Sequence, residues 1–158
     1  MDGPMKSVSS QPVSNAFAVA SLAAMTVGTI GYLVGLWNAE MEMNEKGFYF
    51  TILAFGMYSA VSIQKCVRDR IEGIKVSPIY LGLSWAAIGT AIGLLVIGLY
   101  NANTLALSEK GFYGIAYVLC IFTAVTVQKN TRDALVEKSS HSSIPERGET
   151  TIPPSTFE

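Results

Sequence analysis

The sequence predicts an all-α membrane protein with four transmembrane helices, arranged as two tandem two-helix hairpin repeats in parallel orientation. Two observations predict this class. Half of the 158 residues are apolar and only 15% are charged, and the charges gather in short clusters between long uncharged runs. In addition, one pattern of runs and clusters occurs twice along the chain. Together they leave little chain for a soluble domain.

The uncharged runs have the length of spanning helices, which need roughly 20 apolar residues. The first span is predicted at 16–37 and the second at 47–66. The third and fourth spans, 79–100 and 111–130, repeat the two lengths. A cleaved signal peptide is the alternative for the first run, but the apolar region of a signal peptide is only about 7–15 residues long.

The repeats and their flanking segments follow from these spans. The first two-helix repeat covers 16–70, the second covers 79–135, and a cytoplasmic linker at 71–78 joins them. The terminal segments, 1–15 and 136–158, combine Ser, Thr, Pro and charge with few apolar residues. Such segments cannot bury a core, so we expect both to be disordered and cytoplasmic.

Basic residues orient the spans, because Lys and Arg accumulate on the cytoplasmic side of short connections. The connection after the second span and the tail after the fourth are rich in them, whereas the two other connections carry only Lys46 and Lys110, beside several Glu residues. Both termini should therefore lie in the cytoplasm, which an even number of spans also requires. The orienting residues are Lys65, Arg68, Arg70 and Lys75, then Lys129, Arg132, Lys138 and Arg147.

Two motifs carry the repeat. Glu-Lys-Gly-Phe-Tyr occurs at 45–49 and 109–113, and Gln-Lys-x-x-Arg-Asp occurs at 64–69 and 128–133. Each copy of the unit contains two spans, so both copies should point the same way. This gives a pseudo-twofold axis along the membrane normal rather than an inverted repeat.

These residues resemble the YiaA/YiaB family of inner-membrane proteins, which is defined by a two-helix unit. The resemblance rests on GLWNAEMEMNEKGFYF, IQKCVRD, LSEKGFYG and VQKNTRD, and it covers roughly Ala16 to Asp133. It implies a multi-pass protein of the bacterial inner (plasma) membrane without an established biochemical activity. No functional residue can therefore be carried over from the family.

The repeated polar residues at the outer end allow two interpretations. In the first, they position a helix in the bilayer: Asn44 or Ser108 caps it, and the next Glu lies in its first turn. The Phe-Tyr pairs would then join Trp37 and Tyr100 in an aromatic belt. In the second, a polar site lies at the outer mouth. Its candidate residues are Asn38, Glu45, Lys46, Asn101, Glu109 and Lys110.

A second candidate cluster lies at the cytoplasmic end. Basic residues there favour the negative helix terminus and anionic lipid headgroups, or they could hold a cytoplasmic partner. Each Asp of the cluster follows a Lys by four positions, on the same helical face. The cluster consists of Gln64, Lys65, Arg68, Asp69, Gln128, Lys129, Arg132 and Asp133.

Small residues predict close helix packing. The third span carries Gly89-x-x-x-Gly93 with Ala87 and Ala91 alongside, and the first span carries a similar series. This pattern favours a tight interface between repeats or between subunits. The short hairpin loops favour pairing of the first span with the second and of the third with the fourth. The series in the first span is Ala20, Ala24, Gly28, Gly31 and Gly35.

The sequence offers few residues for catalysis, ion coupling or metal binding. No Asp, Glu, Lys, Arg or His lies at mid-membrane depth, where ion-coupled transporters place such groups. The lone His141 falls in the predicted tail, and Cys66 and Cys120 have no partner at metal-binding spacing, so both are interpreted as reduced thiols. We expect no catalytic residue, metal, cofactor or nucleic-acid partner, and hence no enzyme.

Two function classes stay open at this point. The first is a non-enzymatic structural or accessory protein that acts through helix or lipid contacts, with anionic lipids, a second copy of the chain or a membrane protein as partner, in a stress-related role. The alternative is a small oligomeric permease or channel for an uncharged or weakly polar ligand. That class needs a polar seam, for example along Tyr58, Ser62, Tyr117 and Thr126.

Overall fold

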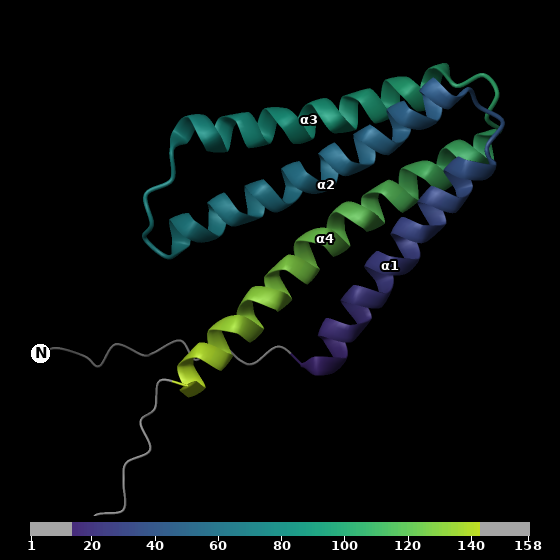
Figure 1. The fold of residues 1–158 in the computed structure, drawn as a ribbon. Helices are drawn as coiled ribbons and strands as arrows, with labels where there is room; N and C mark the ends of the chain where they lie inside the picture. The colour runs from purple at the N-terminus through teal and green to yellow at the C-terminus, as the bar shows by residue number, and fades with distance from the viewer. Residues whose placement is uncertain (1–13, 143–158) are drawn as a thin grey trace, which may run out of the picture.

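The computed structural model describes residues 14–142, with side chains described through residue 136. The chain forms α1 (Asn15–Asn38), α2 (Met43–Ile71), α3 (Pro78–Asn101) and α4 (Leu107–Ser142). All four helices are long and apolar enough to cross a membrane, and the described residues contain no strand. The predicted all-α class with four spans is therefore confirmed (Figure 1).

One predicted segment differs in the structure. α4 continues past the predicted fourth span through Ser142, so residues 136–142, which were predicted to be disordered, are helical and include His141. The remaining parts of the predicted disordered segments, 1–13 and 143–158, lie outside the described residues.

Local sequence signals end α2 and begin α3 in the connection between the repeats. Gly73 follows α2 with φ 76°, a left-handed conformation that glycine adopts without steric cost. The amide of Ile74 then donates to the Asp69 carbonyl at 2.8 Å, which satisfies one of the last free carbonyls of α2. Pro78 is the first residue of α3, where its missing N–H costs nothing.

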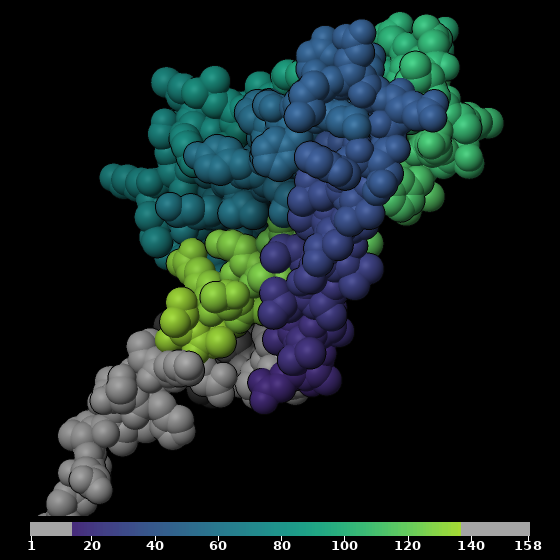
Figure 2. All heavy atoms as spheres, turned by 45° about the vertical axis from the view of Figure 1, so that its right-hand side comes forward, coloured from purple at the N-terminus to yellow at the C-terminus, as the bar shows by residue number. Residues whose placement is uncertain are grey.

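The helices pack chiefly between repeats, which contradicts the expected pairing within each hairpin. α1 packs mainly on α4, and α2 packs mainly on α3, while α1 and α2 touch only slightly. Across Figure 1 the order is α3, α2, α4, α1. In Figure 2 the purple part of α1 likewise lies beside the yellow-green part of α4. The two main pairings are equivalent, because in each one the first helix of one repeat packs on the second helix of the other repeat.

This crossed arrangement divides the helices into two inner and two outer ones. In their most apolar segments, 39% of the α2 residues and 33% of the α4 residues are buried, against 17% in each of α1 and α3. α2 and α4 also touch each other, so the second helices of the two repeats form the centre of the molecule. Neither hairpin therefore encloses a core of its own.

Tyrosines fill the part of the core nearest the two short loops. Tyr49 and Tyr113 are each 3% exposed, and their rings stack with centroids 6.1 Å apart. Tyr32 meets Tyr113 edge-on at 5.4 Å and donates to the Tyr49 carbonyl at 3.2 Å. Because α2 and α4 are the inner helices, the tyrosine of each Phe-Tyr pair belongs to the core, and its expected place in the outer aromatic belt was wrong. Trp37, by contrast, is 74% exposed.

Some of the small residues serve this packing and others do not. A Cβ at Gly35 would lie 2.8 Å from Phe112 Cε1, and a Cβ at Gly98 would lie 2.8 Å from Phe48 Cε1, so each glycine admits a phenylalanine of the other repeat. A Cβ at Gly56 would overlap the Tyr117 hydroxyl. Within one chain the predicted small-residue interface is only partly present, because three of its glycines face open space: Gly31, Gly89 and Gly93. An interface between subunits, the other form of that prediction, stays a prediction.

Candidate functional site

Charged side chains of the spans gather at the two ends of the molecule. We call the end with the loops 39–42 and 102–106 the hairpin end, and the end that holds Arg68 and Arg132 the Arg end. The predicted outer polar motif lies at the hairpin end, and the predicted cytoplasmic cluster lies at the Arg end. Each is built from both repeats.

At the hairpin end, the polar residues of the first repeat bond within their own hairpin. The Lys46 ammonium donates to the Trp37 carbonyl at 2.7 Å, which satisfies an acceptor left free where α1 ends. The Glu45 carboxylate accepts from the Glu42 amide at 3.1 Å and completes a capping box. Asn38 donates to the Val34 carbonyl at 2.7 Å.

The second repeat makes the same local bonds. Lys110 donates to the Tyr100 carbonyl at 3.4 Å, Glu109 accepts from the Ala106 amide at 2.7 Å, and Asn101 donates to the Ile97 carbonyl at 2.8 Å. These contacts support the interpretation that the motif positions helices. The predicted caps were wrong in detail: Asn44 and Ser108 lie inside the first turns, because α2 and α4 begin at Met43 and Leu107, two residues before the first helical positions that these caps would require.

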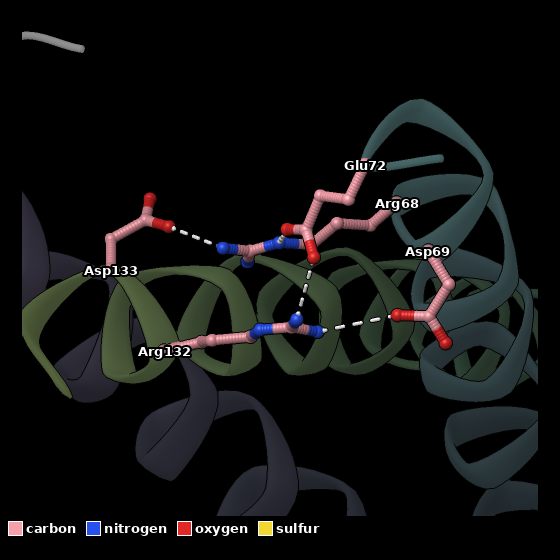
Figure 3. Close-up of polar contacts among 5 residues, drawn as sticks. All are labelled: Arg68, Asp69, Glu72, Arg132 and Asp133. Atoms are coloured by element: carbon pink, nitrogen blue, oxygen red, sulfur yellow. Dashed lines mark hydrogen bonds and ion pairs between the residues drawn. The ribbon is translucent and has the colours of Figure 1, made fainter. Parts of the chain in front are cut away.

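At the Arg end, the matching motif joins the repeats to each other (Figure 3). Arg68 Nη2 lies 3.0 Å from Asp133 Oδ1, and Arg132 Nη1 lies 3.6 Å from Asp69 Oδ1. Under the repeat, Arg68 corresponds to Arg132 and Asp69 to Asp133, so the two ion pairs are one contact made reciprocally. The sequence placed each Asp on the face of its neighbouring Lys, but the observed partners are arginines of the other repeat.

Glu72 completes this network and was missed by the sequence analysis. Its carboxylate bridges both arginines, with Oε1 2.8 Å from Arg68 Nε and Oε2 3.0 Å from Arg132 Nη2. The hydrogen bond from Arg68 is the main cause that lowers the pKa of the Glu72 carboxyl below its usual value. One signal could have found it, because Glu72 follows Arg68 by four positions on a helix.

The other members of the predicted cluster stay outside the ion pairs. Lys65 and Lys129 are exposed and form no salt bridge within the described residues. Gln64 and Gln128 lie one turn further from the Arg end, and each buries a side-chain oxygen that has no hydrogen-bond partner in the described part of the chain. The cluster thus contains paired arginines and aspartates beside two unpaired lysines and two glutamine oxygens without a hydrogen-bond donor in the described residues.

The hydroxyls proposed for a polar seam do not line one path. Tyr58 is 68% exposed on the outer surface, whereas Tyr117 is buried against Gly56. Thr126 donates to the Phe122 carbonyl of its own helix at 2.9 Å. Ser62 is buried, so the four residues face different surroundings.

The remaining reactive side chains are dispersed. Cys66 and Cys120 are buried and form no disulfide, and Cys120 Sγ lies 3.7 Å from Thr29 Oγ1 across the interface of α1 and α4. Among the described residues, no group of three or more His, Cys, Asp or Glu side chains could hold a metal ion. The polar side chains described above form helix caps and ion pairs.

Comparison with known proteins agrees with the repeat. The family model described as the yiaA/B two helix domain matches residues 17–69 and again 80–133. The chain is 53% identical to the inner membrane protein YiaA of Escherichia coli over 121 residues, which are 77% of this chain and 83% of that protein. It is 31% identical to the inner membrane protein YiaB of Escherichia coli over 101 residues, 61% of this chain and 80% of that protein.

A third relative matches over about the length of one repeat. The uncharacterized membrane protein YubF of Bacillus subtilis is 41% identical over 58 residues, which are 36% of this chain and 67% of that protein. No solved structure matches the chain.

Proposed function

The chain belongs to the yiaA/B two-helix domain family of membrane proteins, and from this membership we propose that it is a non-enzymatic structural or accessory protein. It acts through contacts of its helices with a membrane protein partner or with lipids, in a role connected with stress. It resides in the inner membrane with both termini in the cytoplasm. The basic residues of the Arg end support this orientation, because such residues stay on the cytoplasmic side.

The observation that carries the proposal is the filled interior. At the centre of the molecule Tyr32, Tyr117 and Cys120 are at most 1% exposed. Cross-repeat contacts occupy the space between the inner helices, and the ion pairs between the repeats lie at the Arg end. A molecule of this kind presents its outer surface, rather than an internal path, to whatever it recognises.

That outer surface is large and apolar. Within the described residues, α1 and α3 expose bulky side chains along their length, and these would face lipid or a partner helix. They include Val27 at 70%, Ile30 at 55%, Leu83 at 64%, Trp85 at 58% and Val96 at 60% exposure. Because the outer helices carry few buried residues, they are free to make contacts without opening the core.

The test is to extract the protein together with its surrounding native lipid, without detergent, and to identify by mass spectrometry what accompanies it in fixed ratio. A stoichiometric protein partner or a retained lipid supports the accessory function. A homo-oligomer that holds a discrete small solute would contradict it and favour the permease.

A matched pair of variants separates the two functions further. Tyr58→Phe and Thr126→Val remove hydroxyls while keeping size, so a permease that uses them should lose transport. The accessory protein should keep its partner in both variants. Loss of a measurable solute flux in either variant would count against the proposal.

A further inference from the structure

A pocket lies at the hairpin end, between the start of α2 and the end of α3. Its volume is about 260 Å³. α2 lines it with Asn44, Glu45 and Tyr49, and α3 lines it with Gly98 and Asn101. Because the two helices belong to different repeats, the pocket brings two members of the predicted outer polar motif, Glu45 and Asn101, into one lining.

The lining carries a negative charge. Glu45 is the one charged residue that lines the pocket, and it is exposed and forms no ion pair in the described part of the chain. Its Oε2 atom accepts from the Glu42 amide, whereas its Oε1 atom has no hydrogen-bond partner among the described residues. An occupant that fits this lining brings a positive charge to Glu45. The charged residues of the whole hairpin end are Glu40, Glu42, Glu45, Lys46, Glu109 and Lys110, four carboxylates against two ammonium groups, with a net charge of −2.

A second, independent observation concerns Tyr49. This residue is only 3% exposed, yet no hydrogen bond joins its hydroxyl to the described residues. The hydroxyl is not fully enclosed, as that of Tyr117 is. It lies 3.2 Å from the position that a Cβ on Gly98 would occupy, at the wall of the pocket. A buried hydroxyl without a partner costs free energy, so an occupant that bonds to it removes that cost.

Asn101 supplies a further free acceptor. Its Nδ2 atom donates to the Ile97 carbonyl at 2.8 Å, and its Oδ1 atom receives no hydrogen bond from the described residues. The lining therefore offers three acceptors without donors, on Glu45, Tyr49 and Asn101. A primary ammonium group carries one positive charge and three N–H donors, which matches this set.

We propose that this pocket binds the headgroup of one phosphatidylethanolamine molecule from the leaflet at the hairpin end. The ammonium donates to the Glu45 carboxylate, to Asn101 Oδ1 and to the Tyr49 hydroxyl oxygen. The phosphate accepts from Asn44 Nδ2 at the start of α2, where the helix dipole favours negative charge. This inference rests on the proposed function, of which it names one lipid contact.

The surroundings favour a lipid as the source of the ammonium. Phe48 also lines the pocket and is 39% exposed, and Tyr100, which precedes Asn101, is 83% exposed. Exposed aromatic side chains at helix ends lie at the level of the lipid headgroups. Phosphatidylglycerol fits less well, because its headgroup brings no cation to Glu45.

The second repeat holds an incomplete copy of this arrangement. Glu109, Tyr113 and Asn38 occupy the equivalent positions on α4 and α1, but Ser108 stands where the pocket has Asn44. This copy therefore lacks the amide that meets the phosphate. It provides counterpart residues that do not line the pocket.

Matched variants separate the site from general attraction. Glu45→Gln removes the charge but keeps the acceptor for the Glu42 amide, because Gln also completes a capping box. Glu40→Gln makes the same charge change at the same end, on an exposed residue that does not line the pocket. Tyr49→Phe removes only the hydroxyl, and Tyr113→Phe is its counterpart in the other repeat.

The experiment places the full chain in bilayer discs of phosphatidylethanolamine and phosphatidylglycerol and counts retained lipids by native mass spectrometry. The native protein should retain one phosphatidylethanolamine. We expect Glu45→Gln to lower its occupancy at least about fivefold and Glu40→Gln less than about twofold. Tyr49→Phe and Asn44→Ser should each lower it about threefold, and Tyr113→Phe less than about twofold. Thermal unfolding of each variant shows whether the fold is intact.

A change of lipid tests the same site in the native protein. Phosphatidylcholine has the charges of phosphatidylethanolamine but no N–H donor, so its retention should be at least about tenfold lower. Discs of phosphatidylglycerol alone, with ethanolamine added to the solution, test the other source of the ammonium. Ethanolamine should not be retained there.

Four results would overturn the site: equal losses in Glu45→Gln and Glu40→Gln, an unchanged occupancy in Tyr49→Phe, equal retention of phosphatidylcholine, or retention of free ethanolamine. If no lipid is retained while a protein partner is bound in fixed ratio, the lipid site fails and the accessory function stands. A solute bound inside a homo-oligomer would instead remove the accessory function itself.

Discussion

The two ends of the molecule use the same duplicated sequence in opposite ways. At the hairpin end, each copy bonds to itself: Lys46 reaches the Trp37 carbonyl at 2.7 Å, within one repeat. At the Arg end, each copy bonds to the other: Arg68 reaches Asp133 at 3.0 Å, 65 positions away. A motif that recurs at equal spacing can therefore serve as a local cap or as half of a reciprocal contact.

The difference follows from where the helices end. A short loop brings the end of α1 beside the start of α2, so donors in the loop region satisfy nearby free carbonyls. The C-terminal parts of α2 and α4 have no such connection. They meet because the inner helices pack on each other, and the Arg and Asp of each repeat then pair with the Asp and Arg of the other repeat.

The largest expected effect comes from opening the centre on which both ends depend. Gly56→Val introduces atoms where the Tyr117 hydroxyl lies, so the Tyr117 ring or the inner helices must shift. We expect a loss of about 1–3 kcal/mol in the free energy of unfolding. Reversible unfolding in mixed detergent measures it.

Gly93→Val is the control for that substitution, because nothing lies within 4 Å of a Cβ at Gly93. It should change the free energy of unfolding by less than about 0.5 kcal/mol. Equal effects at the two glycines would show that the inner helices do not approach as described.

The next effect tests the reciprocal contact at the Arg end. A double-mutant cycle with Arg68→Ala and Asp133→Ala should give a coupling energy of about 0.5–1 kcal/mol, because the two side chains are partly shielded at 19% and 30% exposure. Arg68→Ala and Arg132→Ala should also be non-additive, since both arginines contact Glu72. A coupling energy of zero would show that Arg68 and Asp133 do not interact across the repeats.

The hairpin end should behave in the opposite manner. Glu45→Ala and Glu109→Ala each remove one acceptor of a helix start and should each cost about 0.5–1 kcal/mol. Because each bond stays inside its own repeat, the two costs should add within about 0.3–0.5 kcal/mol. A large coupling energy between Glu45→Ala and Glu109→Ala in the same unfolding assay would show that the hairpin end, like the Arg end, links the two repeats.

The smallest expected effect is a pH dependence of the free energy of unfolding that arises from Glu72 at the Arg end. The Arg68 hydrogen bond lowers the pKa of Glu72 from its usual 4.5, so the folded state favours the charged form. The resulting stability is fully present above pH 4.5 and is lost as the pH falls through the lowered pKa. Acid unfolding of Glu72→Gln should lack this part of the decline, and an unchanged acid profile would show that the bridge contributes nothing.

Much of the architecture could be predicted from the sequence because it depends on local composition. Four uncharged runs between charge clusters determine four spans, and the two copies of each motif indicate the repeat. The bond of Glu45 is also local, and the helix-positioning interpretation placed this residue in the first turn of its helix. The prediction of which helices pack together was wrong. Short loops favoured pairing within each hairpin, but a loop constrains only the helix ends and does not decide which helix faces pack.

Two further errors follow from that one, and a third has a separate cause. Tyr49 and Tyr113 resemble interfacial aromatics until α2 and α4 are known to be the inner helices. The Asp69 partner was sought on its own helix because the neighbouring inner helix was unknown. Glu72 escaped notice because the matching position in the second repeat is Val136, so the repeat itself gave no signal.

The crossed packing of α1 on α4 is the central claim, and one cross-link tests it most directly. Thr29 Oγ1 lies 3.7 Å from Cys120 Sγ, so Thr29→Cys in a Cys66→Ser background should form a cross-link to Cys120 within one chain when membranes are treated with an oxidant or a short thiol linker. Mass spectrometry of the digested monomer locates the link. We expect rapid, nearly complete linkage of α1 to α4. Absence of that link in the folded monomer would contradict it.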